Sequence, residues 1–243
     1  MKTVFINASP KKRFSASANF IRLQRFFVKG TTVREHLRNK SDHLRVLESL
    51  KDADSVVFAL PLYIDSLPTH IISFLKDLEA FSKENNLNLK IYVISNGGFI
   101  EGKQNAVVFR IFENFCKRSG NAWCGGVGIG GGVMLNVLTI VFYVQVALLF
   151  LNVILNGVQF GNWLPTDVFS GFGMQMLSIA FFYSGALFYI FRQGVHINKQ
   201  AFSDVKFTRV MVPSFIFILI TDIFFFIISI FNGGIFRGWL KKK

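Results

Sequence analysis

The loop at residues 9–17 (SPKKRFSAS) carries residue types that bind phosphate. Its polar side chains are three hydroxyls and three cations, namely Ser9, Ser15, Ser17, Lys11, Lys12 and Arg13. Beside the free N–H groups at the start of a helix, such groups favour an anionic ligand. The loop lacks the GxxxxGK[ST] pattern, so it is not a Walker A loop. A serine-rich helix cap is the alternative explanation.

Two later loops carry groups that suit a flat ligand. PLYIDSLP, starting at residue 61, places Tyr63 beside the end of an apolar run. NGGFIEGKQN, starting at residue 96, combines the glycine turn Gly97-Gly98 with an aromatic ring at Phe99. Each signal is weak by itself. An anion site, an aromatic ring and a glycine turn on three successive loops are stronger together.

The elements between these loops alternate. The pattern predicts strands at 2–7, 31–35, 55–60, 89–95 and 122–127, and helices at 15–28, 44–51, 67–82 and 102–118. Alternating strands and helices indicate an α/β domain with a parallel sheet and right-handed crossovers. Ligands of such sheets bind beyond the carboxyl ends of the strands, and the three loops lie there.

With these loops, the sequence resembles the flavodoxin-like NAD(P)H-dependent FMN oxidoreductases, a family of flavin and quinone reductases. FINASPKKRFSAS is similar to their phosphate loop, usually written INGSP. ALPLYIDSLP and NGGFIEGKQN are similar to their second and third flavin loops, and WCGGVGIGGGVML to the end of that domain. The resemblance covers about residues 1–135. It implies a flavodoxin-like fold, noncovalently bound FMN and NAD(P)H as electron donor.

The resemblance also implies roles for individual residues. The residues expected around the FMN phosphate are Ser9, Arg13, Ser15, Ala16 and Ser17. Those expected to border the isoalloxazine ring are Pro61, Leu62, Tyr63 and Ile64, with Asn96, Gly97, Gly98 and Phe99 closing its other side. Ala8 stands where the family usually has glycine, and its methyl group could crowd the loop. No catalytic acid or base is expected, because the cofactor carries the chemistry.

The second half of the chain is a candidate membrane region. Hydrophobic residues make up 51% of the 243 residues and charged residues 17%, against roughly 25% in ordinary globular proteins. No charged residue occurs from Ser119 to Thr166, and none from Val168 to Phe191. Very hydrophobic soluble core helices are the alternative. We therefore expect a flavodoxin-like FMN-binding domain at 1–130, then an all-α membrane region of two to three transmembrane helices at 133–236, with candidate spans 133–156, 168–191 and 210–231, and a basic tail at 237–243.

The basic residues orient these spans. Lys117 and Arg118 precede the first span, the loop 157–167 has no Lys or Arg, and the loop 192–209 has four. The positive-inside rule then places the N-terminal domain in the cytoplasm, on a multi-pass protein of the cell membrane. The sequence leaves open whether 210–231 crosses the membrane, because a crossing would place the basic tail outside the cytoplasm, against the positive-inside rule. Asp222 inside it is a candidate functional carboxylate, with an interfacial or buried hydrogen-bonded role as the alternative.

Several other patterns exclude functions. Residues 1–45 hold 11 basic and 2 acidic residues without a nucleic-acid motif, which favours attraction to an anionic leaflet. Two Cys without a CxxC pair exclude a disulfide scaffold and a Cys-based zinc site, and the four His show no metal spacing. GxGxxG at 126–131 lacks the acidic residue that a dinucleotide site needs about twenty positions later, so a turn with tight packing is expected.

These observations lead to one main hypothesis. The chain is expected to be a membrane-anchored FMN-dependent NAD(P)H oxidoreductase that passes electrons to a small-molecule acceptor. Its position at the bilayer suggests a quinone. The alternative is a flavodoxin-like electron-transfer, sensory or partner-binding module on a membrane anchor, without substrate turnover. The family resemblance further implies a homodimer.

Overall fold

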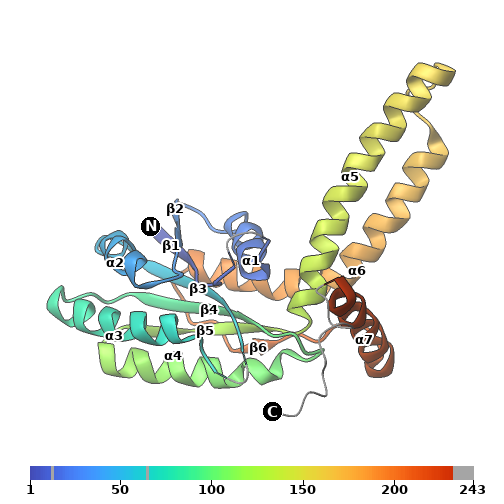
Figure 1. Ribbon diagram of the computed structural model, residues 1–243. Helices are drawn as coiled ribbons and strands as arrows, with labels where there is room; N and C mark the ends of the chain where they lie inside the picture. The colour runs from blue at the N-terminus through green and yellow to red at the C-terminus, as the bar shows by residue number, and fades with distance from the viewer. Residues whose placement is uncertain (12–13, 64–65, 232–243) are drawn as a thin grey trace, which may run out of the picture. The chain divides into compact units, whose positions relative to one another are not determined.

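The structure, a computed structural model, describes residues 1–11, 14–63 and 66–231 (Figure 1). Within these ranges one parallel sheet has the order β2-β1-β3-β4-β5-β6. Its strands are β1 (Lys2–Asn7), β2 (Thr31–His36), β3 (Ser55–Pro61), β4 (Lys90–Asn96), β5 (Ala122–Ile129) and β6 (Lys206–Phe207). The order 2-1-3-4-5 of the first five strands defines the flavodoxin-like doubly wound fold. The expected fold class is therefore confirmed.

Helices cover both faces of the sheet, and β3 is buried along its whole length. The sheet helices are α1 (Ala16–Arg25), α2 (His43–Leu50), α3 (Thr69–Glu84) and α4 (Ala106–Ser119), with 3-10 turns at Lys40–Asp42 and Gly102–Asn105. One apolar core lies under α2, α3 and α4, and includes Phe58, Phe74 and Phe112. The other lies under α1. Alternate residues of each strand supply the two cores, as the pleat of a strand requires.

Two long helices lie between β5 and β6 in the chain. α5 (Gly132–Phe160) and α6 (Thr166–Asn198) are each long and apolar enough to cross a membrane. They form a hairpin that extends away from the sheet (Figure 1). The apolar side chains of the outer part of this hairpin are exposed, for example Phe150, Leu155, Met174 and Leu177. Exposed apolar surface on this scale is typical of contact with lipid or with another protein.

The last part of α6 belongs to the core of the sheet. Ala186, Ile190, Gln193, Gly194 and Ile197 are buried and recur every three or four residues, so they form one face of the helix. This face closes the core under α1. The sequence analysis assigns 168–191 to a membrane span, whereas the structure uses the end of α6 as a covering helix of the sheet. The domain boundary near residue 130 stays a prediction.

Most predicted elements occur within a few residues of their expected bounds. The helix expected at 102–118 begins with a 3-10 turn, and α4 starts at Ala106. β5 continues to Ile129, so Gly126 and Gly128 lie in a strand and only the end of the GxGxxG segment forms a turn. The tight packing expected there is present, because a Cβ atom at Gly126 would meet the ring of Phe109. β6 was not predicted.

The chain divides into two compact units, and the second begins at Met211. Its helix α7 (Ser214–Phe231) is apolar and starts after Pro213. The end of the predicted membrane region at 232–236 and the basic tail at 237–243 lie outside the described residues.

Candidate functional site

The carboxyl ends of the central strands lie in register at one edge of the sheet. Asn7 of β1 pairs with Ala59 of β3, and Pro61 at the end of β3 pairs with Asn96 at the end of β4. Asn96 pairs in turn with Ile129 of β5. The three candidate loops therefore leave the sheet side by side, as the parallel topology requires.

The first loop runs from β1 into α1. Ser15 caps α1, because its Oγ accepts a hydrogen bond from the Ala18 N–H at 3.1 Å. Phe14, just before the cap, has φ of +50°, which a side chain with a Cβ atom rarely adopts. Strained backbone of this kind concentrates at ligand sites. The expected helix cap and the first turn of α1 are therefore both present at this loop.

The hydroxyls of Ser9, Ser15 and Ser17 each accept a hydrogen bond and keep their own hydrogen available for a ligand. Each oxygen accepts a hydrogen bond from within the protein, at 3.0–3.4 Å. A hydroxyl that accepts still has its hydrogen to donate, and no described residue accepts from these three. All three serines are buried, where a donor without an acceptor costs free energy. The three hydrogen bonds run from Lys11 N–H to Ser9 Oγ, from Ala18 N–H to Ser15 Oγ and from Asn96 Nδ2 to Ser17 Oγ.

The second loop presents an aromatic ring. Leu62 N–H donates to the Asn96 carbonyl at 2.8 Å, which ties this loop to the end of β4. Tyr63 and Ser66 exchange backbone hydrogen bonds and close a tight turn. The Tyr63 side chain is 42% exposed, and partial burial raises the pKa of its phenol, which stays protonated at neutral pH.

The third loop is held by the first turn of α5. Gly97 N–H donates to the Ile129 carbonyl at 3.0 Å, and Gly132 N–H donates to the Gly97 carbonyl at 2.8 Å. A Cβ atom at Gly132 would approach Asn96 Oδ1 to 2.7 Å, so this close contact requires glycine. Phe99 projects from the loop and is 58% exposed. Tyr63 and Phe99 thus offer exposed rings on neighbouring loops.

The structure brings together most of the residues that the sequence analysis assigns to this site. Asn96 links all three loops, because its Nδ2 donates to Ser17 Oγ and to the Leu60 carbonyl, both at 3.0 Å. Arg13 and Ile64 lie outside the described residues. Ala8 is buried in the core, has no positive φ, and accepts a hydrogen bond at its carbonyl from His70 Nε2 at 3.1 Å. Its methyl group therefore does not strain the backbone.

The comparisons with known proteins give structural similarity alone. No family model and no curated protein matches the chain. An NADPH-quinone reductase from P. pentosaceus is similar at a TM-score of 0.46 and 15% identity, over 54% of this chain and 86% of that chain. The Trp repressor binding protein from Bacillus subtilis is similar at 0.45 and 15%, over 53% and 84%. With TM-scores below 0.5, these similarities do not bear on function.

The described residues contain neither a cluster of metal ligands nor a reactive thiol. No group of three His, Cys, Asp or Glu there could hold a metal ion. Cys116 and Cys124 are free, buried thiols. Burial raises the pKa of Cys116 to about 12 and also raises that of Cys124, so neither forms a reactive thiolate at neutral pH.

Sequence reasoning missed one polar residue that supports the first loop. Asn136 of α5 donates to the Phe14 carbonyl at 3.0 Å and accepts from the Asn19 amide at 2.9 Å. It therefore fixes the strained residue and the first turn of α1. The available signal was a single amide in the otherwise apolar stretch GGVMLNVL.

Proposed function

We propose that this chain is a membrane-attached FMN-dependent NAD(P)H oxidoreductase that passes electrons to a small-molecule acceptor such as a quinone. The observation that carries the proposal is the set of three buried serine hydroxyls with hydrogens left to donate, at the start of α1. A phosphate group only accepts hydrogen bonds at neutral pH, so it complements this donor set.

The described residues offer the types of groups that bind the phosphate and the ring of FMN. Ser9, Ser15 and Ser17 would bind the phosphate, together with the first N–H groups of α1. Tyr63 and Phe99 would contact the ring, since both are exposed aromatic side chains beside the strand ends. Bound FMN would supply hydride acceptance from a nicotinamide and electron delivery to the acceptor. The chain itself would bind and orient the ring, with Asn96 holding the three loops in place.

Membrane attachment is the second part of the proposal. α5 and α6 supply two helices of sufficient length and apolarity, and the loop between them has no Lys or Arg. The proposed arrangement places the sheet and the 192–209 loop in the cytoplasm. The acceptor is assigned by location, because a quinone dissolves in the bilayer that the hairpin would enter.

The test uses the full-length protein purified in mild detergent. Its visible absorption is recorded, the ligand is released by heat, and chromatography identifies it. About one FMN per chain is expected, followed by NADH or NADPH oxidation with a quinone. Absence of flavin, even after incubation with FMN, would overturn the oxidoreductase assignment. FMN without nicotinamide oxidation would favour the electron-transfer or sensory alternative.

A further inference from the structure

A further candidate site adjoins the proposed phosphate site, with which it shares Ser15, and lies between the first loop, α1, β2 and α5. It is a cavity of about 380 Å³, larger than a water-sized void. Three cations line it, from the first loop, α1 and β2, and none of the described residues that line it is acidic. Its lining includes Lys11, Arg22, Arg34, His36, Ile140 and Tyr143.

Arg34 is one of the cations that the described residues leave partly unsatisfied. It lies on the face of β2 next to Phe5, and its Nε is buried with no hydrogen-bond partner among the described residues. Burial lowers the pKa of Arg34, and the charges of Arg22, Arg25 and Arg38 lower it further. The charges of these four guanidinium groups repel one another, and an anion in the cavity, which Arg22 and Arg34 line, would relieve that repulsion. This cluster explains much of the basic surplus in residues 1–45.

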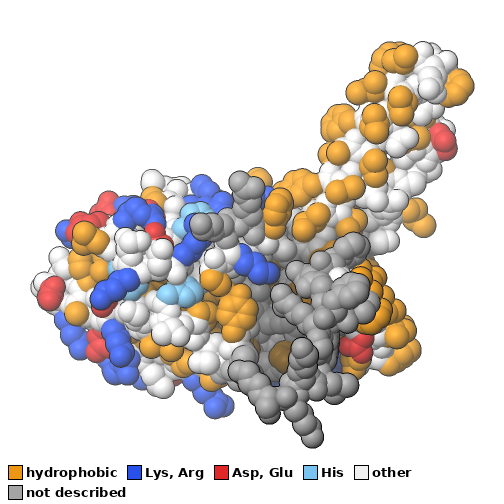
Figure 2. Space-filling model, viewed as in Figure 1, with side chains coloured by type: hydrophobic (Ala, Val, Ile, Leu, Met, Phe, Trp, Pro, Cys, Tyr) orange, Lys and Arg blue, Asp and Glu red, His pale blue; other side chains and the backbone are white. Residues whose placement is uncertain are grey.

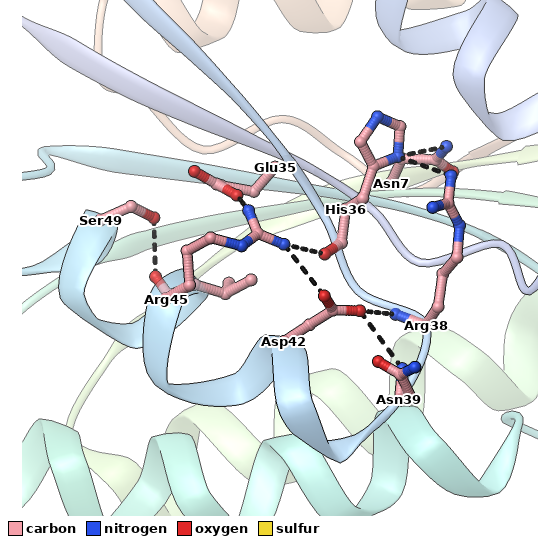
Figure 3. Close-up of polar contacts among 9 residues, drawn as sticks. Asn7, Glu35, His36, Arg38, Asn39, Asp42, Arg45 and Ser49 are labelled. Carbon is pink, nitrogen blue, oxygen red and sulfur yellow. Dashed lines mark hydrogen bonds and ion pairs between the residues drawn. The ribbon is translucent and has the colours of Figure 1, made fainter. Parts of the chain in front are cut away.

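His36 adds an uncharged donor. Its Nδ1 lies 3.3 Å from Asn7 Nδ2 and 3.4 Å from Arg38 Nη2 (Figure 3). Both partner atoms can only donate, so Nδ1 accepts and the hydrogen of the neutral ring is on Nε2. Burial and the charges of Arg34 and Arg38 lower the pKa of His36, which agrees with a neutral ring. Figure 3 shows the second ring nitrogen pointing away from both partners.

The fourth side of the cavity is a membrane helix. Arg22 Nη1 donates to the Tyr143 hydroxyl of α5 at 2.5 Å. From Tyr143 to Phe160, α5 rises about 26 Å, close to the thickness of a hydrocarbon core of about 30 Å. Tyr and Trp concentrate at the two membrane interfaces, and Trp163 follows the other end of α5. With the hairpin in a bilayer as proposed above, the cavity would lie at the level of lipid headgroups.

The lining of the cavity is charged on the first loop, α1 and β2 and uncharged on α5. The visible face of the hairpin has hydrophobic side chains and no Lys or Arg, whereas Lys and Arg side chains lie on the sheet domain below it (Figure 2). Ile140 and Tyr143 belong both to the cavity lining and to the exposed surface of α5. A ligand here would meet cations at one end and a lipid-facing helix at the other.

From this arrangement we infer that the cavity binds the phosphate headgroup of an anionic phospholipid, with the acyl chains lying along α5 beside Ile140 and Tyr143. Arg34, Arg22 and Lys11 contact the headgroup, and Nε2 of His36 donates to it. The lipid fixes the sheet domain against the bilayer at the side of the first loop. The inference rests on the membrane attachment proposed above, but not on bound flavin.

The experiment titrates the full-length protein in a nonionic detergent with dihexanoylphosphatidylglycerol and measures the heat of binding. Saturable binding at one site is expected, with at least tenfold weaker binding of dihexanoylphosphatidylcholine. Because hydrogen bonds to charged groups are strong, R34Q and R22Q are each expected to weaken binding about tenfold. Lys11 is exposed, so K11Q is a second variant with little risk to folding.

The matched control is R110Q, which removes the same charge from an exposed position of α4 on the opposite face of the sheet. It should bind the lipid within twofold of the original protein. Equal affinity of R34Q, R22Q and K11Q would overturn the site. Equal binding of inorganic phosphate would assign it to a soluble ligand, and displacement of the lipid by FMN would assign it to the flavin phosphate. Flavin content, measured by absorption in the same samples, reports separately on the proposed function.

Discussion

Gln24 of α1 donates a hydrogen bond from Nε2 to Oε1 of Gln193 in α6 at 2.7 Å, although 169 residues separate them in the chain. Both side chains are completely buried. Gln193 in turn donates to the Val93 carbonyl of β4 at 3.3 Å. Two amides thus connect a sheet helix, a central strand and the end of α6. The sheet domain is complete only when the chain has returned from the hairpin.

The first prediction concerns this connection. Gln193→Ala removes a buried partner and leaves the Gln24 amide without an acceptor, which costs about 2 kcal/mol of unfolding free energy. Urea unfolding of the detergent-solubilised protein measures the change. Gln104→Ala, at an exposed position, should change stability by less than about 0.5 kcal/mol. Equal stability of both variants would show that the end of α6 is not part of the folded sheet domain.

The second prediction concerns the aromatic rings of the proposed flavin site. Tyr63→Ala and Phe99→Ala should each weaken FMN binding about threefold to tenfold, because an aromatic contact contributes about 0.5–1.5 kcal/mol. Quenching of flavin fluorescence during titration measures the dissociation constant. Phe26→Ala is the matched control, since Phe26 is 82% exposed just after α1 and far from the strand ends. A loss of affinity in the control alone would contradict the site.

The third prediction concerns membrane topology. Asn162→Cys lies in the hairpin loop, and Lys199→Cys lies just after α6 at an exposed position. A membrane-impermeant maleimide should label Asn162→Cys in intact cells and Lys199→Cys only after permeabilisation. The native thiols should give little background, because both are buried. The reverse labelling pattern would invert the proposed orientation, and labelling of both in intact cells would exclude a spanning hairpin.

The fourth prediction follows from the raised pKa of Cys116. Its ordinary value is 9.0, and burial raises it to about 12 in the folded protein. Between these values the unfolded chain has lost the proton that the folded protein retains. Stability should therefore fall as pH rises above 9, by up to about 1.4 kcal/mol per pH unit from this thiol. Below pH 9 the thiol contributes no pH dependence.

Unfolding curves at pH 8 to 11, compared between the original protein and Cys116→Ala, isolate this contribution. Other groups that titrate in this range, Tyr92 among them, are common to both proteins. The variant should be less stable at pH 8 and should lose less stability as pH rises. Parallel curves would mean that the thiol ionises equally in both states.

The fifth prediction concerns Gly125 of β5, the strand next to the edge strand β6. Gly125 has φ of +101°, and a Cβ atom there would lie 1.5 Å from the Ser203 carbonyl oxygen. Gly125→Ala should therefore cost more than about 2 kcal/mol, because both the backbone conformation and the contact oppose it. Gly98→Ala is the control for stability, since none of the described residues has an atom within 4 Å of its Cβ position. Thermal unfolding distinguishes the two.

The sequence predicted the local elements well because local physics decides them. β1 occupies Lys2–Asn7 as expected, since a short apolar run bounded by Ser9-Pro10 favours a buried strand. Ser15 caps α1 because its hydroxyl can satisfy a free N–H of the helix. The two long apolar segments were recognisable from composition alone, because few soluble helices remain uncharged over such lengths.

The tertiary structure decided which of these segments meet. Ile190 lies at the end of a predicted apolar span and Ile197 in the loop predicted after it, and only packing against α1 and the sheet shows that both complete the core under α1. Likewise, Arg22 and Tyr143 are 121 residues apart and form one wall of a cavity. Hydrophobic periodicity indicates that one face of a helix is buried. Which element covers that face depends on chain topology and on the shapes of the packed side chains. That choice is a property of the folded chain.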